Sequence, residues 1–142
     1  MKDTASQIHW TFPANQAGSQ DACARCEAWI IARGLPQRMA FRALLILEEL
    51  FTNTVKYGGP AAAAGGVRIA LEAREAGVVL RYGDRGAAFD PLHTAPVASA
   101  TGNAIGGQGL RIIQSLVQHT LYRREDGWNL LEMTINGDAD AR

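Results

Sequence analysis

Three polar side chains recur at helical spacing in the stretch LEELFTNTVKYG, residues 47–58. Glu49 and Asn53 are four residues apart and Lys56 follows three later, so on an α-helix they share one side. A carboxylate can take a proton from a hydroxyl, and an amide oxygen is a suitable ligand for a hard cation. The same spacing is typical of the solvated face of an amphipathic helix. Taken alone, this stretch leaves both interpretations open.

A second group follows in GDRGAAFDP, residues 83–91. Asp84 continues the alternation of Leu80 and Tyr82, so we expect it on the same face of a strand. A carboxylate on a buried face needs hydrogen-bond donors, and the exocyclic amine of a purine is one. Gly86, two residues later, would let a flat ring approach closely. The alternative is a plain Asp-Arg-Gly turn in which Asp84 caps backbone amides.

A glycine-rich segment precedes the third expected helix. Gly106, Gly107 and Gly109 stand before Leu110 and the apolar run that continues to His119. Free amides at a helix N-terminus bind phosphate, and glycines let the phosphate reach the backbone. The Rossmann pattern would need a parallel strand directly before the glycines, and a P-loop would need a following Gly-Lys-Ser/Thr. A flexible loop before a helix is the alternative.

The elements that must position these groups follow from hydrophobic periodicity. In chain order we expect a strand (8–12), two helices (16–33, and a second with Pro36 in its first turn that runs to Tyr57), a loose connector (61–66), a hairpin (67–84), a loop (85–108), a helix (109–119) and a second hairpin (121–135). Antiparallel hairpins with grouped helices predict an α+β fold, a two-layer sandwich with a mostly antiparallel sheet and helices on one face.

The apolar side of the second helix is expected to carry Leu44, Leu47, Leu50, Phe51 and Val55. In the first helix, Cys23 and Cys26 are interpreted as small packing residues, with a redox pair as the alternative. A zinc site would need about four ligands, and no second Cys or His pair exists.

Composition bounds the class of protein. The 142 residues suit one domain, and 47% hydrophobic content can fill a core. Lys and Arg total 14, as do Asp and Glu, and the absence of a basic surplus argues against a nucleic-acid binder. No apolar run has the length of a signal peptide core or a bilayer span. We therefore expect a cytoplasmic protein that does not enter a membrane.

The three stretches, in this order, resemble the boxes of the GHKL ATPase superfamily, which has the Bergerat, or histidine-kinase-like ATPase, fold. LEELFTNTVKYG resembles its N box, DRGAAFDP its first glycine box and GGQGLRII its second. The short length and the DRGxxFDP and GGxGL forms are most similar to the bacterial anti-sigma factor serine/threonine kinases. The resemblance covers about residues 8–136 of a single domain, 1–142.

The resemblance implies a role for each matched residue. Asn53 would bind the Mg²⁺ that bridges the ATP phosphates, Glu49 would act as general base, and Lys56 would reach a phosphate. Asp84 would bind the adenine amine, with Gly86 under the ring.

Further roles follow along the chain. Gly106, Gly107, Gly109 and Leu110 would lie on the phosphate side, and residues 90–105 would form a lid. Asn129 stands where relatives often carry a threonine that helps the adenine-binding aspartate, and its alternation with Leu131 and Met133 faces it inward. Tyr57 departs from the histidine of many relatives.

Three functions compete. The first is a kinase that transfers the γ-phosphate of ATP to a Ser or Thr of an anti-anti-sigma partner with the STAS fold. The second is a non-catalytic, ATP-binding regulator that sequesters a sigma factor or another partner. The third, part of a histidine kinase or a DNA-remodelling ATPase, is disfavoured because no phosphoacceptor helix pair or transducer domain is present. A homodimer is compatible with each.

Overall fold

The computed structural model describes residues 6–75, 77–88 and 113–136. Its elements are β1 (Gln7–Phe12), α1 (Gln16–Ala32), α2 (Gln37–Tyr57), α3 (Gly59–Gly65), β2 (Val67–Arg74), β3 (Gly77–Asp84), β4 (Val117–Glu125) and β5 (Trp128–Asn136). Residues 113–116 are also helical. None of the helices in these ranges is long and apolar enough to cross a bilayer.

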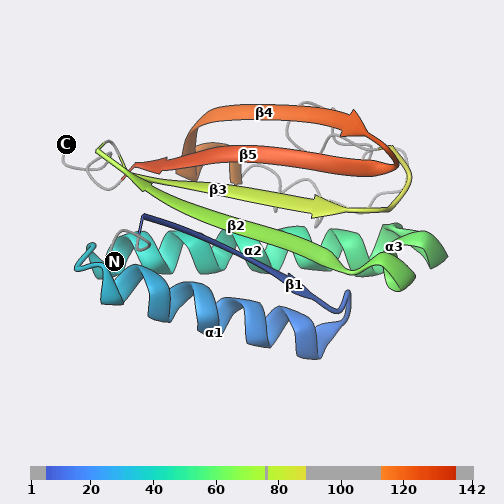
Figure 1. Cartoon of the computed structure of the whole chain (residues 1–142), viewed down its shortest axis with the longest axis horizontal. Helices are drawn as coiled ribbons and strands as arrows, with labels where there is room; N and C mark the ends of the chain where they lie inside the picture. The colour runs from blue at the N-terminus through green and yellow to red at the C-terminus, as the bar shows by residue number, and fades with distance from the viewer. Residues whose placement is uncertain (1–5, 76, 89–112, 137–142) are drawn as a thin grey trace.

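The five strands form one sheet in the order β1-β2-β3-β5-β4, and every neighbouring pair is antiparallel. Helices α1 and α2 lie side by side against one face of this sheet (Figure 1). The predicted two-layer α+β sandwich is therefore confirmed. Because β3 is central, its last residue, Asp84, is paired with Val67 on β2 and with Asn129 on β5.

The core fills the space between the helices and the sheet. Its fully buried large side chains include Ile30 from α1, Ile46, Leu47, Leu50 and Phe51 from α2, and Ile69, Leu71, Leu80, Met133 and Ile135 from the strands. Leu44 is half-buried, but the placement of Val55 on the core side was wrong, because this side chain is 52% exposed. Thr54 takes the core position of that turn, since it follows Leu47 by seven residues and so returns to the same side.

Three boundaries differ from the prediction. Pro36 precedes α2 in an extended conformation (φ −60°, ψ 143°), so it caps the helix and does not enter its first turn. The expected connector 61–66 lies largely within α3, because its alanines have the highest helix propensity and Pro60 suits a first turn. Residues 117–119 belong to β4 and not to the preceding helix, since Val117 pairs with Ile135.

The cysteine prediction holds for packing. Cys26 is fully buried in the core, Cys23 is half-buried against it, and both are free thiols. Burial raises the pKa of Cys26 to about 12 and that of Cys23 to about 11, and the negative charges of Glu48 and Glu27 add to the second shift. Thiols with such pKa values stay protonated at neutral pH, which disfavours the redox alternative.

Candidate functional site

A small hollow of about 40 Å³ opens where the C-terminal part of α2 meets the ends of β3 and β5. Its lining residues are Leu50, Asn53, Thr54, Tyr57, Gly58, Tyr82, Asp84, Gly86, Asn129 and Leu131. It brings together Asn53, Asp84, Gly86 and Asn129, which the sequence singled out in three separate segments.

The remaining predicted residues lie elsewhere or are not described. Glu49 is half-buried one helical turn before Asn53, and Lys56 is exposed; neither lines the hollow. Gly106, Gly107, Gly109 and Leu110 lie outside the described residues, as does the lid segment 90–105. The roles of all these residues stay predictions.

The Asp84 carboxylate is held by three donors. Its Oδ1 accepts from the backbone N of Gly86 at 3.1 Å and from Nδ2 of Asn129 at 2.9 Å. Its Oδ2 accepts from Oγ1 of Thr54 at 2.6 Å. The turn interpretation is thus partly right, because Asp84 does cap a backbone amide, but the same carboxylate also lines the hollow.

Thr54 and Tyr82 are members of this site that the sequence reasoning missed. Thr54 Oγ1 lies 2.7 Å from the Tyr82 hydroxyl, and both side chains are buried. Burial raises the pKa of Tyr82; the hydrogen bond with Thr54 opposes that shift, and the charge of Asp84 adds to it. The sequence held one signal for Thr54, its seven-residue spacing from Leu47 on the apolar side of α2.

Asn129 is the centre of a second set of hydrogen bonds. Besides Asp84, its Nδ2 donates to the carbonyl of Ala87 at 2.9 Å. Its Oδ1 accepts from the Tyr122 hydroxyl at 2.6 Å and from Nη1 of Arg124 at 3.1 Å. The side chain is buried, as its alternation along β5 predicted. Two residues of edge strand β4 therefore help to orient Asn129 on β5, and Asn129 in turn bonds to Asp84 at the end of β3.

Gly86 is required by the approach of two backbone segments. A Cβ at this position would lie 2.9 Å from Cα of Gly58, which caps the C-terminus of α2. The backbone carbonyl of Gly86 also accepts from Nη1 of Arg124 at 2.6 Å. The loop after β3 therefore packs closely against the end of α2 and is hydrogen-bonded to β4. The close contact with Gly58 is by itself a sufficient reason for a glycine at position 86.

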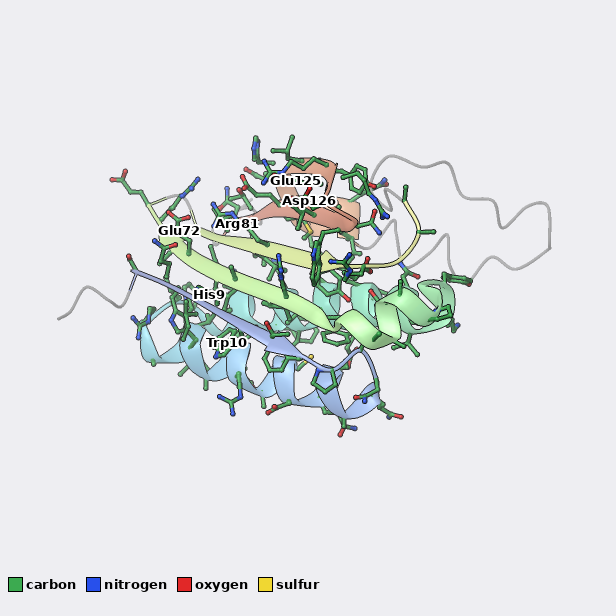
Figure 2. The ribbon with its side chains drawn as sticks, turned by 45° about the vertical axis from the view of Figure 1, so that its right-hand side comes forward. His9, Trp10, Glu72, Arg81, Glu125 and Asp126 are labelled. Carbon is green, nitrogen blue, oxygen red and sulfur yellow. The ribbon has the colours of Figure 1, made fainter. Side chains whose placement is uncertain are left out.

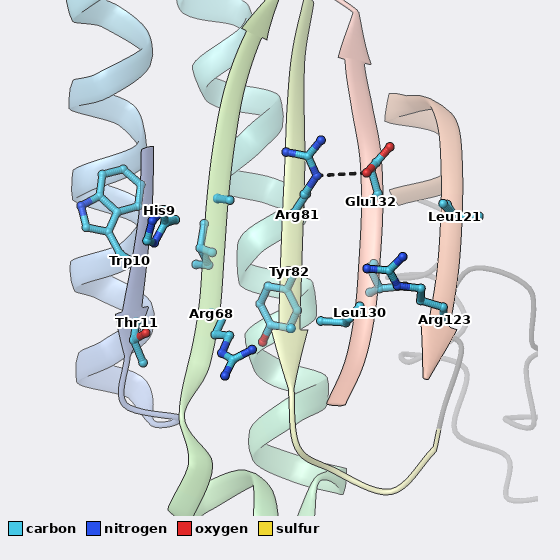
Figure 3. A pocket seen from close by; sticks show the side chains of 14 residues that line it. His9, Trp10, Thr11, Arg68, Arg81, Tyr82, Leu121, Arg123, Leu130 and Glu132 are labelled. Atoms are coloured by element: carbon cyan, nitrogen blue, oxygen red, sulfur yellow. Dashed lines mark hydrogen bonds and ion pairs between the residues drawn. The ribbon is translucent and has the colours of Figure 1, made fainter. Parts of the chain in front are cut away.

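A much larger hollow, about 530 Å³, lies on the face of the sheet that turns away from the helices (Figure 3). Arg81 bonds there to Glu132 at 3.0 Å and to Glu72 at 3.1 Å, and Figure 2 shows Glu72 and Arg81 on the same side of the sheet. Of the predicted site residues that the structure describes, none lines this hollow. The buried polar side chains of the described residues, Thr54 and Asn129, both line the smaller hollow, and a few convergent polar groups are typical of a ligand site.

The described residues alone do not form a metal cage. Within them no three His, Cys, Asp or Glu side chains gather closely enough to hold a metal ion. Asn53 offers one neutral amide oxygen beside the hollow. Such a ligand suits a Mg²⁺ ion that takes its other ligands from phosphate and water.

The fold and the hollow define a two-layer α+β domain with a polar site between α2 and the end of the central strand. More particularly, the chain belongs to the histidine kinase-like ATPase domain family, whose sequence profile matches residues 12–135. The serine/threonine-protein kinase BtrW of Bordetella bronchiseptica is 31% identical over 100 residues, which cover 68% of this chain and 70% of BtrW.

Two solved structures share the fold. The structure of the RsbU and RsbW domains of Rv1364c from Mycobacterium tuberculosis matches with a TM-score of 0.66 and 17% identity, over 92% of this chain and 32% of that chain. This chain therefore spans about a third of the length of that solved chain. The SiaB-SiaC complex from Pseudomonas aeruginosa matches with a TM-score of 0.62 and 16% identity, over 90% of this chain and 88% of that chain.

Proposed function

We propose that the chain is an anti-sigma factor-type protein kinase that binds Mg²⁺-ATP and phosphorylates a Ser or Thr of a STAS-type anti-anti-sigma protein. The observation that carries the proposal is the meeting of Asn53 and Asp84 at one hollow, although α2 and β3 lie in separate parts of the chain. Membership of an ATPase family and the similarity to a serine/threonine-protein kinase support it.

The donor and acceptor groups fit a nucleotide. The three donors on Asp84 leave its carboxylate with further acceptor capacity, which suits the amine of adenine. The hollow between the described residues is about 40 Å³, less than the size of a purine, so these residues supply one wall of the site. Bound Mg²⁺ would neutralise developing phosphate charge, with Asn53 as its protein ligand.

Glu49 is the proposed general base. It lies one helical turn before Asn53 and is half-buried on α2. In the transfer, the hydroxyl oxygen of the acceptor residue forms a bond to the γ-phosphorus, and the bond from that phosphorus to the bridging oxygen of ADP breaks. The hydroxyl proton passes to the Glu49 carboxylate. Neighbouring Glu48 is exposed and points about 100° away around the helix, so it does not fit this role.

Two substitutions test these assignments separately. Wild-type protein should bind Mg²⁺-ATP in the micromolar range, roughly −6 to −8 kcal/mol by calorimetry. Asn53→Ala should weaken this binding. Glu49→Ala should leave it nearly intact but slow transfer from radiolabelled ATP to a recombinant STAS protein by roughly 10²–10⁴-fold. Glu48→Ala is the matched control and should change neither quantity.

The outcomes separate the two candidate functions. Absence of calorimetric heat and of a thermal shift with millimolar ATP would contradict nucleotide binding itself. Tight binding without transfer to any STAS protein of the same genome would favour the alternative function, a non-catalytic regulator that uses ATP as a structural ligand. Full transfer by Glu49→Ala would remove the catalytic assignment and leave the binding site standing.

A further inference from the structure

The hydroxyls of Thr54 and Tyr82 form a directed pair beneath Asp84. Thr54 Oγ1 lies 2.6 Å from Oδ2 of Asp84 and 2.7 Å from the Tyr82 hydroxyl. A threonine hydroxyl carries one hydrogen, and an ionised carboxylate only accepts. Thr54 therefore donates to Asp84, and Tyr82 must donate to Thr54. The direction of both hydrogen bonds follows from this count.

The two hydroxyls are shielded from solvent, and packing restricts their movement. Thr54 is 4% exposed and Tyr82 is 3% exposed, so water does not compete for either hydroxyl. The ring of Tyr82 packs edge-on against Phe51, with centroids 5.7 Å apart and an interplanar angle of 84°. This packing holds the Tyr82 hydroxyl in place, and through Thr54 it holds one oxygen of Asp84.

The bonds to the described residues leave the carboxylate a single acceptor position. Among these residues, Oδ1 accepts from Gly86 and Asn129, whereas Oδ2 accepts from Thr54 alone. A carboxylate oxygen accepts about two hydrogen bonds, so Oδ2 keeps one free lone pair beside the hollow. With three donors attached, the carboxylate cannot pivot to offer that lone pair in another direction.

We infer that Thr54 and Tyr82 are positioning residues that set the selectivity of this site for a 6-aminopurine over a 6-oxopurine. The inference rests on the proposed function, the binding of ATP at this hollow. A fixed acceptor matches the 6-amino group of adenine and meets a lone pair on the 6-oxygen of hypoxanthine. A carboxylate released from Thr54 could instead turn to the ring N1–H of the 6-oxopurine, and discrimination would fall.

The test compares the dissociation constants of ATP and ITP by calorimetry in the presence of Mg²⁺. Wild-type protein should favour ATP by about ten-fold or more, the usual size of one mismatched hydrogen bond to a charged group. Thr54→Val should reduce this ratio to about three-fold or less, and Thr54→Ser should restore it. Thr52→Val, on an exposed residue of the same helix, is the matched control and should keep the wild-type ratio.

A double substitution separates selectivity from folding. Thr54→Val leaves the buried Tyr82 hydroxyl without its acceptor, so the melting temperature of this variant should fall by about 3–6 °C relative to the wild type. In Thr54→Val/Tyr82→Phe no orphan hydroxyl remains, so the melting temperature should recover while the ATP-to-ITP ratio stays low. A merely structural role predicts that both quantities recover together.

The results separate this inference from the function on which it rests. A wild-type ratio in Thr54→Val, or a serine variant that fails to restore selectivity, would overturn the positioning role while ATP binding stands. Equal binding of ATP and ITP by the wild type would also overturn the positioning role and leave ATP binding standing. Wild-type protein that binds neither nucleotide would overturn the proposed function and the inference together.

Discussion

Replacing Asn129 by alanine should destabilise the fold by about 2–3 kcal/mol. The side chain donates to Asp84 and to the Ala87 carbonyl, each at 2.9 Å, and these two bonds are lost outright. Bonds within a protein contribute about 1 kcal/mol each, and somewhat more when the acceptor is charged. Tyr122 and Arg124 are better solvated and can turn to water, so their bonds add less.

Urea unfolding followed by tryptophan fluorescence measures this cost, because Trp128 is buried one residue away. The slope with urea should stay unchanged, so that the midpoint alone reports the loss. Gln118→Ala is the matched control: this exposed residue lies on the neighbouring strand β4, and its amide bonds to Asn136 at an exposed position. That variant should stay within about 0.5 kcal/mol of the wild type.

A cost below about 1 kcal/mol for Asn129→Ala would refute the reasoning. So would equal costs for Asn129→Ala and Gln118→Ala. Either result would mean that the loop after β3 keeps its place without the hydrogen bonds that converge on Asn129. The prediction holds whether or not the hollow binds a nucleotide.

Two other predictions concern a buried thiol and a close backbone contact. Burial raises the folded-state pKa of Cys26 from its ordinary 9.0 to about 12, so its contribution to stability is complete below pH 9 and is lost as pH rises toward 12. Urea unfolding between pH 8 and 11 should therefore show a steeper fall in the wild type than in Cys26→Ala, and parallel curves would contradict this. Gly86→Ala should cost about 1–3 kcal/mol, because its Cβ would press on Gly58, whereas exposed Ala87→Ser should cost little in the same assay.

Sequence periodicity was sufficient for the layers and for most faces of the elements, although it misplaced Val55 on α2. Asp84 and Asn129 could be placed inward because strands alternate, and Asn53 could be placed near them because the motif order is specific. The Asp-Gly dipeptide at residues 126–127, a common hairpin signal, does lie between β4 and β5, and both residues have positive φ (53° and 84°).

The partners across elements could not be predicted in the same way. The contact of Thr54 with Tyr82 depends on how α2 is rotated and shifted along the sheet, and neither quantity is local to a segment. Arg124 was missed because its role depends on the register of edge strand β4, which is irregular between Val117 and Thr120. The two boundary errors have different causes. At α3 the helix propensity of the alanines outweighed the low complexity of the segment. At the start of β4, pairing with β5 outweighed the helical periodicity of the preceding residues.

Two of the three hydrogen bonds to Asp84 join residues 30 and 45 positions apart, and the bond from Arg124 to Gly86 spans 38. Contacts of such sequence separation form late in folding, because long loops must close before they contribute. We therefore expect a growing chain to contain α2 and β3 long before it has a binding site, since Asn129 arrives only with the last hairpin. In refolding experiments, Asn129→Ala should then accelerate unfolding and leave the folding rate nearly unchanged. A marked slowing of folding would instead place this part of the sheet in the folding nucleus. The binding site would then form early in refolding, before the rest of the sheet is complete.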